Sequence, residues 1–201
     1  MNYTLADIKK LREETGAAIL DCKNALVQAR TWDEAVRLLV EKSDNKVERV
    51  KAAGRATGEG GIFSYIHHDR RIGVLLELNC STDFVARSES FQQLARELAL
   101  QIAGVAPIYI SYEAVPTGII RETRKKLLEK DPSLAYMPVK KRREMVEKRL
   151  RAALSEQVLL LQPWVKDHSV TVGDLVSRVI AETGENIVVA RFCRYELGES
   201  G

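Results

Sequence analysis

The sequence predicts an α+β protein with a small helical head, a linking helix, and a core in which a small antiparallel sheet is covered by helices. Apolar residues recur at helical spacing in the first 45 residues, and two short apolar runs of strand length follow residue 58. Helical spacing then returns, and the chain finishes on another strand-like run. The expected domains are residues 1–45 for the head, 46–58 for the linking helix and 59–201 for the core.

The head is expected to contain three short helices. Their apolar stripes are, in order, Leu5, Ile8 and Leu11, then Ile19, Cys22, Leu26 and Ala29, then Trp32, Ala35, Val36 and Leu39. Thr15-Gly16 ends the first stripe, and Thr31 precedes the third as an N-cap. Three helices in about 40 residues make a minimal bundle, of a size that usually serves as a binding module.

The linking helix is expected to run from residue 46 to residue 57, a segment rich in Ala, Val and basic residues. The cluster Gly58-Glu59-Gly60-Gly61 then breaks the chain. This cluster is too short for a phosphate-binding loop and lacks its Lys. We therefore interpret it as a hinge at a domain boundary.

The core is expected to begin with two strands joined by a hairpin loop, at residues 62–67 and 72–79. The second is nearly all apolar, which predicts that it is buried. Ser81, Thr82 and Asp83 are good N-cap residues for a helix behind it. The remaining expected elements are an extended piece at 107–111, helices at 117–130, 139–161 and 171–183, and a last strand at 186–197.

Composition and cysteine usage narrow the class of protein. The chain is 45% hydrophobic and 29% charged, as in globular proteins. No apolar run approaches the ~20 residues needed to cross a bilayer, so we expect a cytoplasmic protein without a membrane partner. Cys22, Cys80 and Cys193 form no C-x-x-C pair, which argues against a zinc or redox site. Cys22 and Cys80 are expected to be buried, reduced thiols.

No catalytic or metal-binding motif is present. The sequence lacks a P-loop, a dinucleotide-binding loop, a zinc-protease motif and a nucleophile elbow. His67 and His68 are adjacent, so a strand would point their rings to opposite faces and disfavour one shared metal. We therefore expect no catalytic residue, no metal and no cofactor, and we interpret the protein as non-enzymatic.

A basic stretch runs from Arg121 to Arg151, with 12 Lys and Arg against 5 Asp and Glu in a chain of net charge +3. It has two interpretations: the site of an RNA-binding or ribosome-associated protein, or the solvated face of helices. Tyr136 is its one aromatic residue, so it lacks a stacking platform for bases. We expect no direct nucleic-acid binding and keep the RNA-binding function as the alternative.

One segment stands out: Asn79-Cys80-Ser81-Thr82-Asp83-Phe84-Val85-Ala86-Arg87. Here a buried strand runs into a polar turn, then into a large aromatic residue and a helix. Two interpretations of Phe84 remain open. It either seals the corner between strand and helix, or projects from the helix tip as a wedge used on a partner.

This segment resembles the signature turn of the elongation factor Ts family. The head segment 11–26 (Leu-Arg-Glu-Glu-Thr-Gly-Ala-Ala-Ile-Leu-Asp-Cys-Lys-Asn-Ala-Leu) resembles the family's opening motif. Segments 160–167 and 184–192 near the C-terminus are also similar to the family pattern. The resemblance therefore covers nearly the whole chain with several independent motifs.

The resemblance implies a ubiquitin-associated-like fold for the head and a partner, elongation factor Tu, from which the family releases GDP. It implies that Thr82, Asp83, Phe84 and Val85 enter the partner beside its nucleotide and disturb the bound Mg²⁺. Other partner contacts are implied at five positions: Ile19, Leu20, Lys23, Lys51 and His67. An adaptor that acts through the head alone is a rival, but it leaves the turn unexplained.

The sequence departs from the family pattern at two places. Ala18, Ile19 and Leu20 stand where Gly and two Met are usual, a swap that keeps an apolar tip. In the linking helix, Glu48 and Ala52 stand where Lys is common.

Long family members have two core lobes, one with the Thr-Asp-Phe-Val turn and one with a His-bearing hairpin. This chain carries both features in one lobe, so we expect two chains to pair as a homodimer. The expected interface includes Trp164, Phe192 and Cys193.

Overall fold

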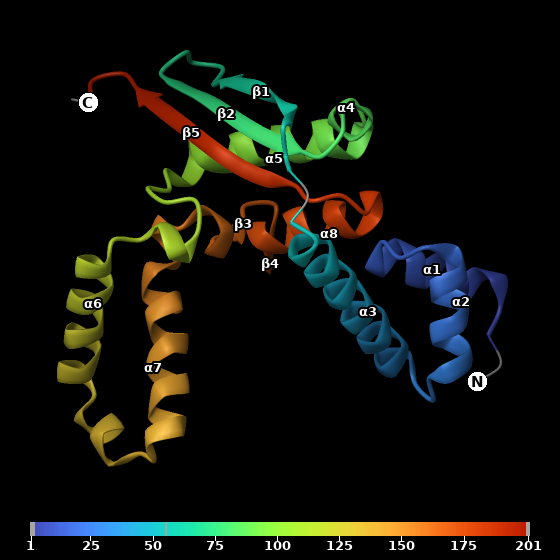
Figure 1. Cartoon of the computed structure of the whole chain (residues 1–201), viewed down its shortest axis with the longest axis horizontal. Helices are drawn as coiled ribbons and strands as arrows, with labels where there is room; N and C mark the ends of the chain where they lie inside the picture. The colour runs from blue at the N-terminus through green and yellow to red at the C-terminus, as the bar shows by residue number, and fades with distance from the viewer. Residues whose placement is uncertain (1–2, 55, 200–201) are drawn as a thin grey trace. The chain divides into compact units, whose positions relative to one another are not determined.

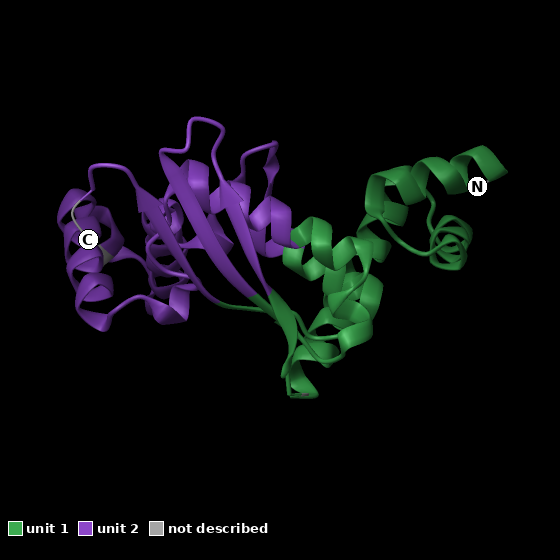
Figure 2. Cartoon of the chain, turned by 90° about the horizontal axis from the view of Figure 1, so that it is seen from above, with its two compact units in different colours: residues 1–61, 78–94, 176–190 green, residues 62–77, 95–175, 191–201 purple. Residues whose placement is uncertain are grey.

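The structure is a computed structural model that describes residues 3–54 and 56–199. Its helices and strands (Figure 1) confirm the predicted α+β class. Contacts within the chain divide it into two compact units, coloured separately in Figure 2. The first unit comprises residues 1–61, 78–94 and 176–190, and the second comprises residues 62–77, 95–175 and 191–201.

The head begins with α1 (Leu5–Thr15) and α2 (Ile19–Gln28), and α3 (Trp32–Ala52) follows (Figure 1). Thr4 caps α1, because its hydroxyl accepts a hydrogen bond from the Asp7 amide at 3.3 Å. The Thr31 hydroxyl caps α3 in the same way, accepting from the Glu34 amide at 3.2 Å. α1 and α2 begin at the first residues of their predicted stripes, Leu5 and Ile19, and α3 begins directly after its predicted N-cap, Thr31.

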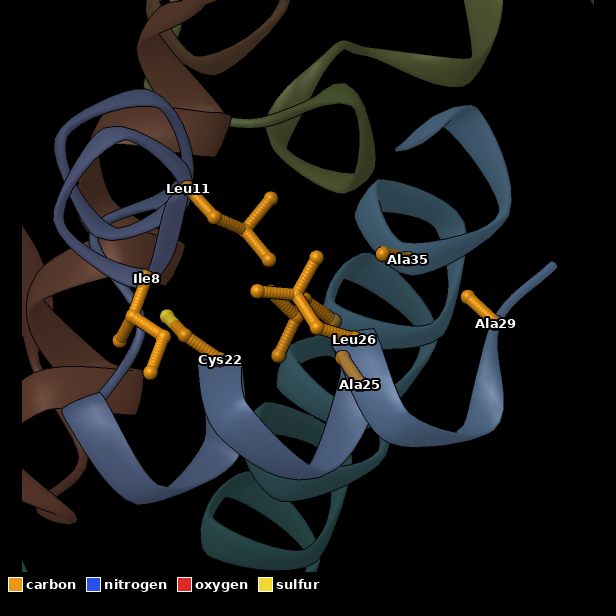
Figure 3. Packing of buried hydrophobic residues seen from close by; sticks show 8 residues of the cluster. Ile8, Leu11, Cys22, Ala25, Leu26, Ala29 and Ala35 are labelled. Carbon is orange, nitrogen blue, oxygen red and sulfur yellow. The ribbon is translucent and has the colours of Figure 1, made fainter. Parts of the chain in front are cut away.

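The head has its own apolar core, shown in Figure 3. Leu11 of α1 and Leu26 of α2 point toward one another at its centre, and both are almost fully buried. Cys22 lies beside them, which confirms its prediction as a small buried hydrophobe, and burial raises the pKa of its thiol. The other buried members of the cluster are Ile8, Ala25, Ala29, Ala35 and Leu39.

α3 continues past the predicted end of the head at residue 45 and ends at Ala52. No Gly or Pro interrupts residues 40–52, so nothing stops the helix earlier, and the first helix-breaking residue is Gly54. Residues 46–52 of the predicted linking helix are therefore the last part of α3, whereas its residues 53, 54, 56 and 57 are not helical. Arg55, which the predicted linking helix includes, lies outside the described residues. The division into head, linking segment and core remains a prediction.

A three-stranded antiparallel sheet has the order β1-β2-β5, with β1 at Glu59–Ile66, β2 at Ile72–Cys80 and β5 at Val188–Glu196. Each strand begins and ends within three residues of its prediction. Gly60 and Gly61, predicted as part of a hinge, instead lie inside β1. Gly60 is required there, because a Cβ atom would collide with the carbonyl oxygen of Leu78.

β2 is buried on one face only. Val74, Leu76 and Leu78 are buried, whereas Leu75 is 48% exposed. The prediction that the whole strand is buried was therefore wrong, because an apolar run does not show whether both faces of a sheet are covered. The covered face lies against α5 (Glu89–Val105), where Arg194 of β5 donates a hydrogen bond to the Ala103 carbonyl at 3.3 Å.

Two further helices, α6 (Thr117–Lys130) and α7 (Val139–Leu154), pair as a hairpin (Figure 1). α6 matches its prediction, but α7 ends seven residues before the predicted residue 161. The reason is that backbone groups after Leu154 form hydrogen bonds with another segment of the chain. The Leu159 amide donates to the Tyr109 carbonyl at 2.8 Å, so the chain runs beside the predicted extended piece instead of continuing as a helix.

The sequence did not predict a small hairpin of β3 (Pro163–Trp164) and β4 (Asp167–Thr171), which precedes α8 (Val172–Thr183). A buried amide orders this hairpin. Gln101 of α5 donates from Nε2 to Gln162 Oε1 at 3.0 Å and accepts from the Val165 amide at 2.9 Å. Its buried polar groups are therefore paired.

Candidate partner-binding site

The signature turn follows β2 directly and forms the short helix α4 (Asp83–Ala86), labelled in Figure 1. Thr82 is its N-cap, with an extended backbone and a hydroxyl that accepts from the Val85 amide at 3.3 Å. The Cys80 thiol donates to the Thr82 carbonyl at 3.1 Å. Cys80 is buried as predicted, and burial raises the pKa of its thiol.

Phe84 is 82% exposed, while its neighbours Val85 and Ala86 are buried. Successive helical residues point about 100° apart, so burying Val85 turns Phe84 outward. This excludes the interpretation that Phe84 seals the corner between strand and helix. The ring is therefore free to contact another molecule.

Asp83 lies beside Phe84 and forms an ion pair with Arg87, with 3.2 Å between Oδ2 and Nη2. Both side chains are mostly exposed, at 63% and 80%. Such a pair contributes little to stability, so its rearrangement on contact with a partner costs little.

Glu185, which the sequence analysis did not identify as a site residue, contacts this turn. Its Oε2 accepts from the Thr82 amide at 3.0 Å, and its Oε1 accepts from the Thr82 hydroxyl at 2.7 Å. The residues are 103 positions apart in sequence. The available signal was Gly184-Glu185-Asn186 after a predicted helix, which gives no indication of what the carboxylate binds.

The head offers a second exposed surface. Ile19 and Leu20, in the first turn of α2, are 57% and 65% exposed. Lys23 is exposed on the same helix, and Lys51 is exposed in the last turn of α3. Ile19 and Leu20 thus form a small apolar tip with a cation nearby.

His67 is half-buried after the end of β1, and its Nδ1 lies 2.9 Å from the Tyr65 hydroxyl. The expectation that His67 and His68 face opposite ways was wrong. β1 ends at Ile66, so both histidines lie in the turn, and their ring centroids are 4.3 Å apart. Within the described ranges, no group of three or more His, Cys, Asp or Glu is placed to hold a metal.

The residues predicted for the dimer interface divide into two places. Phe192 and Cys193 of β5 both line a hollow in the sheet together with Ile62, Leu75 and Leu76, and Arg191 and Glu77 form an ion pair of 2.6 Å there. Leu75 and Cys193 are exposed and lie on the open face of the sheet, whereas Leu76 is buried. Trp164 does not line this hollow. It is half-buried in β3, and its Nε1 is buried without a hydrogen-bond partner.

Comparison with known proteins supports the resemblance stated above. The sequence model of the family described as Elongation factor TS matches residues 5–199. The chain belongs to the elongation factor Ts family. Membership of the elongation factor Ts family places it among the translation elongation factors.

Individual relatives agree over almost their whole length. The chain is 46% identical to elongation factor Ts of Methylacidiphilum infernorum over 193 residues, which are 96% of this chain and 94% of that protein. It is 41% identical to elongation factor Ts of Fervidobacterium nodosum over 200 residues, covering 99% and 100%. A chloroplastic elongation factor Ts of Cyanidioschyzon merolae is 43% identical over 195 residues, covering 96% and 92%.

The elongation factor Ts residues singled out here fall in different units. The head and the Thr82–Val85 turn belong to the first unit, whereas His67 and the open sheet face belong to the second. Among the helices that the structure describes, none has the length and apolarity to cross a bilayer.

Proposed function

We propose that this protein is a guanine-nucleotide exchange factor that binds elongation factor Tu carrying GDP and promotes release of the nucleotide. The observation that carries the proposal is the 82% exposure of Phe84 on a helix of four residues, within the turn that resembles the family signature. A buried neighbour and an N-cap hold the aromatic ring outward, as a wedge requires. Membership of the elongation factor Ts family supports elongation factor Tu as the partner.

In this mechanism the head docks on the GTPase domain of the partner through Ile19, Leu20 and Lys23. Apolar side chains exposed by more than half supply the area to be buried, and the cation adds charge complementarity. Lys51 and His67 make further contacts. Docking through several separate surfaces holds the wedge at one place on the partner.

Asp83 and Phe84 then insert between helices beside the nucleotide and disturb the shell of the bound Mg²⁺. That ion is a large local charge that holds the phosphates, so a change around it weakens nucleotide binding. The factor and the nucleotide lower each other's affinity by the same ratio. Exchange makes and breaks no covalent bond, so we assign the chain no catalytic residue and no cofactor, and we place its action in the cytoplasm.

We also propose that the working unit is a homodimer. The open face of the sheet carries exposed apolar side chains at alternating positions of neighbouring strands: Ile62 and Ile66 of β1, Leu75 of β2, and Tyr195 of β5. A two-fold axis through this face would bury it against a copy of itself and bring the two Cys193 residues close. One chain would then offer Phe84 while the other offers His67.

RNA binding by the α6–α7 hairpin, which contains most of the basic stretch, is less well supported. Several of its cations pair within the hairpin, as in Lys126–Glu122 at 2.7 Å and Arg149–Asp131 at 2.7 Å. Arg151 also lies over the Tyr112 ring, 4.4 Å from its centroid. These contacts fit a solvated helical surface.

The proposed function is tested by following labelled GDP as it leaves elongation factor Tu. Substoichiometric amounts of this protein should accelerate release by orders of magnitude and should not hydrolyse any nucleotide. If release has the same rate with and without the protein, the proposed function is wrong.

A further inference from the structure

We propose that Glu185 is a positioning residue for the exchange wedge: its carboxylate fixes Thr82 and so determines where α4 presents Phe84. The inference rests on the proposed function and extends it to a residue in a different part of the chain. Glu185 need not touch the partner, because it acts through Thr82.

α4 depends on its contacts with the rest of the chain. A helix of four residues has almost no independent stability, because it contains too few internal hydrogen bonds to offset the cost of fixing its backbone. α4 follows the end of β2, and Phe84 lies 82% exposed, so its own side chain adds little packing. External contacts must therefore hold the helix in place.

The contact that fixes α4 is made at its N-cap, Thr82. Glu185 accepts from both the amide and the hydroxyl of Thr82, at 3.0 and 2.7 Å. The hydroxyl donates to Glu185 and at the same time accepts from the Val85 amide, so one side chain connects the carboxylate to the first turn of α4. Hydrogen bonds to an ionised acceptor are about twice as strong as neutral ones.

The segment that carries Glu185 is itself held by hydrogen bonds. α8 ends at Thr183, and Gly184 takes a left-handed backbone, with φ of 73° and an amide that donates to the Ile180 carbonyl at 2.8 Å. The Glu185 amide donates to the Thr183 hydroxyl at 3.3 Å. Lys46 of α3 donates to the Ala181 carbonyl in the last turn of α8. Glu185 thus extends from a fixed helix end.

The test compares Glu185→Ala with Glu182→Ala, which removes the same charge from an exposed position of α8. GDP release from elongation factor Tu is measured against factor concentration to separate the maximal rate from the half-saturating concentration. Glu185→Ala should lower the maximal rate about tenfold, the value of one hydrogen bond to a charged group, with little change in half-saturation. Glu185→Gln, which keeps one good acceptor, should fall between, and Glu182→Ala should match the wild type.

Two readouts separate positioning from a merely structural role. In a Phe84→Ala background, Glu185→Ala should cause no further loss, because its effect passes through the ring. In the free protein, hydrogen exchange at the Thr82 amide should speed up in Glu185→Ala but not in Glu182→Ala, while amides of β2 stay protected.

The outcomes are distinct. If the wild type does not accelerate GDP release, the proposed function is wrong. Hydrogen exchange at the Thr82 amide still shows, in that case, whether Glu185 holds Thr82 in place. If the wild type is active but Glu185→Ala and Glu182→Ala have the same maximal rate, Glu185 has no positioning role. The same conclusion follows if Glu185→Ala lowers the rate by the same factor with Phe84 present and with Phe84→Ala. If Glu185→Ala melts before assay, Glu185→Gln gives the same comparisons.

Discussion

Neighbouring side chains in the Thr82–Val85 turn have opposite environments, and this contrast gives the turn its proposed use. Val85 is 4% exposed and anchors α4, whereas Phe84 is 82% exposed. The same contrast occurs at the head, where Leu20 is exposed and Cys22 is buried on the same helix. In both places a buried residue fixes the orientation of an exposed apolar one, which would lower the entropy lost in the proposed binding.

The Leu20 contact leads to a prediction at this scale. Leu20→Ala should raise the concentration of factor needed for half-maximal GDP release about tenfold, because a largely exposed Leu would lose most of its burial against the partner. The maximal rate should hardly change, since the wedge is intact. Val27→Ala, on the same helix and 59% exposed, is the matched control. Equal effects of the two changes would argue against docking through the α2 tip.

At the scale of elements, local signals predicted helices that have a regular apolar stripe. Thr31 and the apolar spacing behind it predicted the start of α3, and the 117–130 periodicity predicted α6. Contacts distant in sequence decided the rest. β3 and β4 depend on Gln101, over 60 residues away, and the end of α7 depends on the Tyr109 backbone.

The site divides in the same way. Its proposed contact residues could be named from the sequence because they lie in short motifs with recognisable spacing, and their contacts with a partner remain a prediction. Glu185 was not, because its hydrogen bonds to Thr82 exist only once the chain has folded. The open face of the sheet was missed because an apolar strand has the same pattern whether one or both faces are covered.

The α6–α7 hairpin gives a prediction for an element. Combined Lys140→Ala, Lys141→Ala and Arg143→Ala changes, all at exposed positions of α7, should alter solubility and salt response but change GDP release less than about twofold. Exchange assays and fluorescence anisotropy with a single-stranded RNA check this. Tight RNA binding by the wild type that weakens steeply with salt, and disappears in the variant, would favour the RNA-binding alternative instead.

At the scale of the whole molecule, the open sheet face and the single core lobe are the two features behind the proposed dimer. Sedimentation at micromolar concentration should give a mass near twice 22.6 kDa. Ile62→Glu should produce monomers, because it places a charge in the apolar face at a position that is 70% exposed in the single chain. Cys193→Ser should leave the dimer intact, since association does not need a disulfide.

The control for the dimer is Val139→Glu, a similar change at a 72% exposed position of α7. It should leave the mass unchanged. A wild-type monomer that is fully active in exchange would contradict the dimer, and a dimer unaffected by Ile62→Glu would place its interface elsewhere.

The most direct test of the central claim is the rate of GDP release from elongation factor Tu with Phe84→Ala at saturating concentration. In the proposed mechanism, the Phe84 ring weakens GDP binding because it is buried against the partner. Removing the ring should therefore slow GDP release about 10- to 100-fold. Tyr136→Ala, which removes another ring that is 90% exposed, should release GDP at the wild-type rate, and both variants should melt at the wild-type temperature. A folded Phe84→Ala variant with wild-type exchange would contradict the account.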